Sequence, residues 1–119
     1  MKPTHQVLTE AAEILEAQPR LNKTGCHHQP VYDDGKIVYY EHCIMGAVLA
    51  AMYDNPGYSN GTPSFTNANA DWLQFEYIGR RIVARLGHTD WSEIYYWNDR
   101  IATKEEAVIL LRELAKEVA

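Results

Sequence analysis

The stretch that decides the fold is CHHQPVYDDGKIVYYEHCIMGAVLAAM, residues 26–52. Near its middle lies Asp34-Gly35, a dipeptide typical of two-residue hairpin turns, because Gly35 can adopt the positive φ that such turns need. β-branched and aromatic residues flank this turn on both sides, as they do in paired strands. We therefore predict a β-hairpin over residues 25–41.

The second part of the stretch, residues 44–52, is apolar on every side of a helix, which is typical of a buried helix. One side of it carries only small residues: Gly46, Ala47, Ala50 and Ala51. A neighbouring helix can approach such a side closely. We predict that this segment is the central helix of the core.

Apolar residues at helical spacing predict a first helix over about residues 4–18 and a third over about residues 68–86. Between the second and third helices, residues 54–67 form a long, turn-rich loop. Residues 88–99 predict a short helical turn followed by a loop. Thr103 and Glu106 have the spacing of a capping box, which marks the start of the last helix.

These elements define a mainly helical α+β fold with the order helix, β-hairpin, buried helix, long loop and two further helices. A chain of 119 residues with 46% apolar residues is expected to form a single globular domain over residues 1–119. The net charge of −5 argues against nucleic acid and anionic membranes as partners. We find no secretory signal and no membrane-spanning run, and we expect a cytoplasmic protein.

Both cysteines and three of the five histidines fall within residues 26–43. In a hairpin with a two-residue turn, positions whose numbers sum to 69 face each other. This register places Cys26 opposite Cys43 and His27 opposite His42. Since side chains alternate between faces, one face carries Cys26, His28 and Cys43.

Four interpretations of this cluster are open. The thiols are buried and inert beside surface histidines; they form a disulfide; they bind zinc; or they catalyse. The zinc ligands would be Cys26, His28 and Cys43, with either His42 or His27 as the fourth. In the catalytic case Cys43 would be the nucleophile of a thiol hydrolase, stabilised as a thiolate by the helix that it starts, with His28 or His88 as the base. We expect inert thiols, with no cofactor.

The C-terminal part contains Trp97-Asn98-Asp99 followed by Thr103-Lys104-Glu105-Glu106, and Cys43-Ile44-Met45-Gly46-Ala47 lies earlier. These motifs resemble those of a small domain family without assigned activity, seen mainly in actinobacteria and their phages. Its members combine a Cys-x-x-Gly-Ala helix start with a C-terminal Trp-Asn-Asp and a Thr-x-x-Glu helix. The resemblance implies this fold and a phage or bacterial origin.

Asn98 and Asp99 are expected to bond nearby backbone groups and fix the turn into the last helix, while Trp97 fills the core. The three arginines of the third helix, Arg80, Arg81 and Arg85, are interpreted as a solvated face rather than a phosphate site.

Aromatic residues exceed what so small a core can hide, and surface aromatic residues favour interfaces. The expected partner-binding residues are Tyr39, Tyr40, Tyr58, Tyr95, Tyr96 and Arg100. We expect a small, non-enzymatic accessory protein that binds another protein, which could be a second copy of itself.

Overall fold

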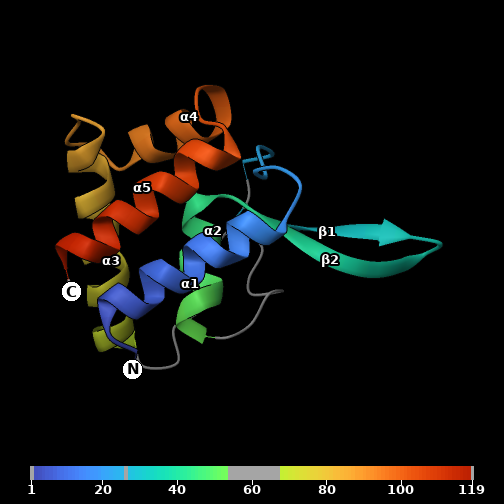
Figure 1. The fold of residues 1–119 in the computed structure, drawn as a ribbon, viewed down its shortest axis with the longest axis horizontal. Coiled ribbons are helices and arrows are strands. Elements are labelled where there is room, and N and C mark those ends of the chain that lie inside the picture. The colour runs from blue at the N-terminus through green and yellow to red at the C-terminus, as the bar shows by residue number, and fades with distance from the viewer. Residues whose placement is uncertain (1, 26, 54–67, 119) are drawn as a thin grey trace.

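The structure, a computed structural model, describes residues 2–25, 27–53 and 68–118. Its elements in chain order are α1 (Thr4–Ala17), β1 (His28–Asp33), β2 (Lys36–His42), α2 (Ile44–Tyr53), α3 (Ala68–Arg85), α4 (Ser92–Arg100) and α5 (Lys104–Glu117). The helices form one body, and the hairpin of β1 and β2 projects from it (Figure 1). The predicted α+β fold is confirmed.

The core is built around α2, whose residues 44–51 are all buried. This helix packs against α1 on one side and contacts α3, while α1 also packs along α5. Burial of a helix that is apolar all round removes much nonpolar surface from water, which stabilises the fold. The predicted buried central helix is confirmed.

The hairpin turn forms at the predicted dipeptide. Asp34 and Gly35 both have positive φ, 53° and 75°, as a type I′ turn requires. The closing pair is Asp33 with Lys36, and Tyr32 faces Ile37. This is the register expected from the sequence.

Beyond Tyr32 the register changes because β2 contains a bulge. Val31 pairs with Tyr39, so that Val38 is an extra residue on β2. At the root of the hairpin His28 therefore lies opposite His42, and the predicted pairing of His27 with His42 is wrong. The sequence around Val38 gives no local signal of this extra residue, since Ile37-Val38-Tyr39 suits a regular strand equally well.

The segment after α3 also differs from its prediction. Residues 92–100 form the helix α4 rather than a short turn and a loop, so that α2 is followed by α3, α4 and α5. The last helix begins as predicted. The Thr103 side chain accepts a hydrogen bond from the Glu106 N–H, and the Glu106 carboxylate accepts one from the Thr103 N–H.

Gly46 allows the hairpin root to lie directly against α2. A Cβ atom at this position would be only 1.7 Å from the His27 carbonyl oxygen. The obstacle is backbone rather than a flexible side chain, so it cannot simply rotate away. The absence of a side chain at Gly46 therefore fixes how the start of the hairpin sits on the central helix.

We expect Gly46→Ala to lower the free energy of unfolding by about 2 kcal/mol or more, since overpacking typically costs about 1–3 kcal/mol. Helix propensity alone predicts the opposite sign, a gain of about 1 kcal/mol. Urea denaturation measures the difference. Ala84→Gly, at an exposed position of α3, is the control and should cost only about 1 kcal/mol. A Gly46→Ala protein as stable as the wild type would contradict the close approach.

Candidate functional site

The histidines and Cys43 meet at the root of the hairpin, where it joins α2. The rings of His28 and His42 have centroids 6.1 Å apart, and both residues are buried. His27 lies beside Cys43, whose N–H donates to the His27 carbonyl at 3.1 Å. Cys26 lies outside the described residues, so its predicted pairing with Cys43 is not tested.

His27 faces the helices. Its Nε2 atom is hydrogen-bonded to the hydroxyl of Tyr95 on α4 at 3.0 Å, and its ring packs edge-on against Phe75 of α3. Burial, with a contribution from Cys43, raises the pKa of Tyr95 to about 12. Tyr95 is half-buried, and its hydroxyl is used in this internal contact. Partner binding by Tyr95 stays a prediction.

Cys43 precedes the first residue of α2, and its sulfur accepts a hydrogen bond from the Gly46 N–H at 3.3 Å. The thiol is buried, and this burial raises its pKa to about 12, although backbone N–H groups of the helix act in the opposite direction. A protonated, inaccessible thiol is a poor nucleophile. The helix start therefore does not give Cys43 the thiolate character that a thiol hydrolase needs.

Asn98 connects three segments that are distant in sequence. Its Oδ1 atom accepts from the Ile44 N–H at 2.9 Å, and its Nδ2 atom donates to the Asn22 carbonyl at 2.9 Å. The same Nδ2 donates to the Asp99 carboxylate. Asn98 was expected to bond nearby backbone groups in a turn. That expectation is wrong, because Asn98 lies inside α4 and bonds backbone groups that are distant in sequence. Trp97 is half-buried and packs against the core.

Metal binding depends on residues that lie partly beyond the described chain. Within residues 2–25, 27–53 and 68–118, no three His, Cys, Asp or Glu side chains are grouped so that they could hold a metal ion. In that same part of the chain, the Nδ1 atoms of His27 and His28 are buried without a hydrogen-bond partner. Cys26, one of the predicted ligands, lies outside the described residues, and zinc binding therefore stays a prediction.

The arginines of α3 are engaged with carboxylates. Arg85 contacts both Glu113 and Glu117 of α5, and Arg81 lies 4.0 Å from Glu117. Arg80 pairs with Glu76 on its own helix at 3.0 Å. These pairs support the interpretation of a solvated, charge-balanced face.

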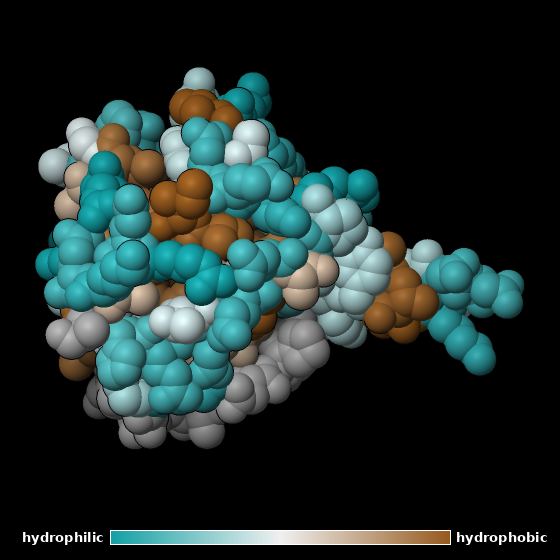
Figure 2. Space-filling view, viewed as in Figure 1, coloured by the Kyte–Doolittle hydropathy of each residue, from teal (hydrophilic) through white to brown (hydrophobic). Residues whose placement is uncertain are grey.

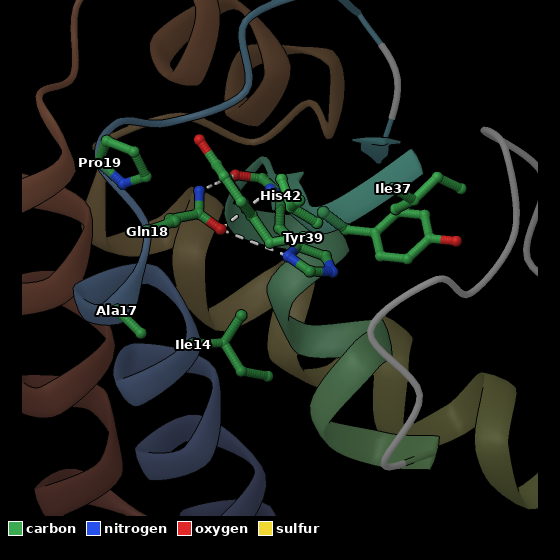
Figure 3. Close-up of a pocket in the computed structure, with 9 residues that line it drawn as sticks. Ile14, Ala17, Gln18, Pro19, Ile37, Tyr39 and His42 are labelled. Atoms are coloured by element: carbon green, nitrogen blue, oxygen red, sulfur yellow. Dashed lines mark hydrogen bonds between the residues drawn. The ribbon is translucent and has the colours of Figure 1, made fainter. Parts of the chain in front are cut away.

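The sequence analysis missed a groove between the end of α1 and β2 (Figure 3). It has a volume of about 700 Å³ and is lined by Ile14, Ala17, Gln18, Pro19, Ile37, Val38, Tyr39, Tyr40 and His42. Most of these side chains are apolar, and Tyr39 and Tyr40 are two of the predicted partner-binding residues. Nothing in the sequence of α1 signals that its C-terminal end faces the strand Lys36–His42.

Gln18 forms the polar end of this groove and is buried. Its Oε1 accepts from the His42 N–H at 3.0 Å, and its Nε2 donates to the His42 carbonyl at 2.8 Å. Of the other predicted partner-binding residues, Tyr96 and Arg100 are exposed on α4, and Tyr58 lies outside the described residues.

The fold and site define a small α+β domain with a neutral, hydrogen-bonded cluster at the root of a projecting hairpin. The chain belongs to DUF6197, a family of unknown function whose sequence model matches residues 1–117. No curated protein and no solved structure matches it. Along the described residues, no helix combines the length and apolar character needed to cross a membrane.

We expect Cys43 to resist iodoacetamide in the folded protein at about pH 8, where an ordinary thiol of pKa about 8.5 reacts. Peptide mapping by mass spectrometry reads Cys43 separately from Cys26, and labelling should appear once urea is added. Fast labelling of folded Cys43 would contradict its burial. Labelling that needs only a chelator, together with about one zinc per chain by elemental analysis, would instead support a metal site.

Stability is expected to fall on acidification. Burial lowers the pKa of His27 and His28 below 6.5, and for His27 the neighbouring His28 adds to this effect. The unfolded chain then binds protons that the folded chain does not. The stabilising contribution is complete above the unfolded pKa of 6.5 and is lost as the pH falls through the folded-state values.

The urea midpoint should therefore decrease between about pH 7.5 and about pH 5, measured with a chelator present so that metal binding does not contribute. His28→Gln should make this decrease shallower. His5→Gln, at an exposed position of α1, is the matched control and should leave the slope unchanged. Equal slopes in all three proteins would rule out the buried histidines as the source.

Proposed function

We propose that this chain is a small, non-enzymatic accessory protein of phage or bacterial origin that acts in the cytoplasm by binding another protein. The observation that carries the proposal is the apolar groove along β2, on a hairpin that projects from the helical body. The origin is supported by the Cys-x-x-Gly-Ala and Trp-Asn-Asp motifs of the sequence.

Exposed apolar side chains on the hairpin support binding at this place. Ile37 and Val38 are 45% and 55% exposed, and both line the groove. Figure 2 shows hydrophobic atoms on the projecting hairpin, between more hydrophilic surfaces. Apolar and aromatic side chains next to each other on a surface are typical of association sites. The tyrosines Tyr39 and Tyr40 add aromatic area to the same groove.

The cluster at the hairpin root supports a binding role over catalysis. Cys43 is protonated and buried, and Tyr95 is occupied by His27. A thiol hydrolase needs an accessible thiolate close to a base. We therefore assign the cluster a structural role, which is to hold the hairpin on α2.

We expect the double substitution Ile37→Ser and Val38→Ser to weaken partner binding about tenfold or more, because each buried aliphatic side chain contributes about 1.5–3 kcal/mol. Light scattering over a range of concentrations tests self-association, and affinity capture from a bacterial lysate tests other partners. Ile109→Ser is the control, since Ile109 is equally exposed but lies on α5.

Two results would contradict the proposal. One is a strict monomer at high concentration together with a capture experiment that recovers no protein. The other is a partner whose affinity is the same for the hairpin variant and for the Ile109→Ser control, because binding would then not involve the groove.

A further inference from the structure

The groove follows the outer edge of β2, the edge that faces away from β1. Among the described residues β2 pairs with β1 alone. The Cys43 N–H donates to the His27 carbonyl, and backbone groups of an antiparallel strand alternate between its two edges. Up to the bulge, the backbone N–H and C=O of Glu41 and Tyr39 therefore face β1. The backbone N–H and C=O of His42 and Tyr40 face the groove.

Gln18 already occupies the first position along this edge. Its side-chain amide accepts a hydrogen bond from the His42 N–H and donates one to the His42 C=O, which is the exchange that a residue of a neighbouring strand would make (Figure 3). The Gln18 side-chain amide thus lies at the position where a third strand would begin. Its burial and its additional bond to the Arg20 carbonyl hold it in place.

Tyr40 is the next residue along the edge. Within the described part of the chain, no group bonds its outward N–H and C=O. Beside it lie the apolar walls of the groove, with Ile14 and Pro19 on one side and Ile37 on the other. A volume of about 700 Å³ falls in the range typical of ligand sites, about 300–1,000 Å³.

We infer that the outer edge of β2 binds an extended peptide segment of a partner protein, which adds as a strand at Tyr40 and places an apolar side chain in the groove. This inference rests on the proposed protein-binding function and specifies its mode. Strand addition satisfies the backbone groups of an edge, and alternate side chains supply the specificity.

The other edge of the hairpin is less suited to this role. Pro30 pairs with Tyr40 and therefore faces outward on β1, where it has no N–H to offer. An added strand on that side would lack a hydrogen bond at this position. The two edges of the hairpin are thus unequal, because at this pair only the Tyr40 side offers both an N–H and a C=O.

A second copy of the chain fits the edge less well than an unrelated peptide. Its β2 carries the same Gln18 and the same bulge, so that in a pair of β2 strands both partners are restricted at these points, whereas a peptide carries no such restriction of its own. Each copy also carries a net charge of −5, which opposes association. Charge complementarity favours a neutral or basic segment.

The probe is a phage-displayed library of linear peptides of about twelve random residues, long enough for one strand. A selected peptide is then synthesised with backbone N-methyl groups at every second residue, in the two possible registers. We expect one register to abolish binding and the other to preserve it, because only one edge of an added strand faces β2. Binding should also slow hydrogen exchange of the Tyr40 amide at least tenfold, as seen by NMR.

Replacing Tyr40 by its α-hydroxy acid exchanges its backbone N–H for an ester oxygen. It also makes the Tyr39 carbonyl a weaker acceptor, but Tyr39 faces β1 and not the groove. This ester should weaken peptide binding about threefold to tenfold, as expected for the loss of one hydrogen bond. Protection of the Glu41 amide in the free proteins shows that the hairpin itself is intact.

Strand addition is overturned if no peptide is enriched, or if both N-methyl registers bind equally and Tyr40 exchange is unchanged. If partner binding still depends on Ile37 and Val38 in those cases, the proposed protein-binding function stands, and only strand addition as the mode of binding is rejected. If the Tyr40 amide becomes more protected from hydrogen exchange as the protein concentration rises, without peptide, a second copy is the occupant. That result would overturn our choice of partner.

Discussion

The side chain of Asn98 makes the contacts on which the arrangement of the hairpin depends. It is fully buried, and its amide bonds the first N–H of α2 at Ile44 and the carbonyl of Asn22 before β1. Both groups would otherwise be polar atoms in an apolar core, where a missing hydrogen bond costs about 1–3 kcal/mol. One residue of α4 therefore fixes the start of the central helix and the chain that leads into the hairpin.

The other groups at the same place reinforce this constraint. Cys43 supplies its sulfur to the Gly46 N–H, and the missing side chain of Gly46 lets the His27 carbonyl come close. With Ile44 bonded to Asn98, the orphan N–H groups of the first turn of α2 find partners. The cysteine and the histidine that suggest chemistry in the sequence thus act here as helix-end and packing residues.

Local sequence signals predicted much of this fold. Asp34-Gly35 specified its turn because few dipeptides accept two positive φ angles, and Thr103 with Glu106 specified a helix start through bonds made within four residues. The bulge at Val38 could not be found in this way. The strands are held at the root of the hairpin by contacts that are not local, His42 by Gln18 at the end of α1 and His27 by Tyr95 of α4.

The same limit explains why the sequence predicted the candidate surface only in part. Tyr39 and Tyr40 were identified because aromatic residues on a hairpin are conspicuous, whereas the facing wall of α1 was not. Gln18 carries no motif, and only the folded chain brings it to His42. Tyr95 lies next to the exposed Tyr96, yet its hydroxyl bonds the buried His27, a contact between distant segments that no local pattern signals.

An isolated two-stranded hairpin is marginal in water, and its edges invite unwanted pairing. This hairpin restricts that pairing at three points: Pro30 on one edge, the bulge at Val38 and the side chain of Gln18 on the other. Such protection leaves a short stretch around Tyr40 rather than a long, uniform edge. In the proposed strand addition, a short edge beside an apolar groove selects partners by side chain as well as by backbone, which distinguishes it from a general aggregation surface.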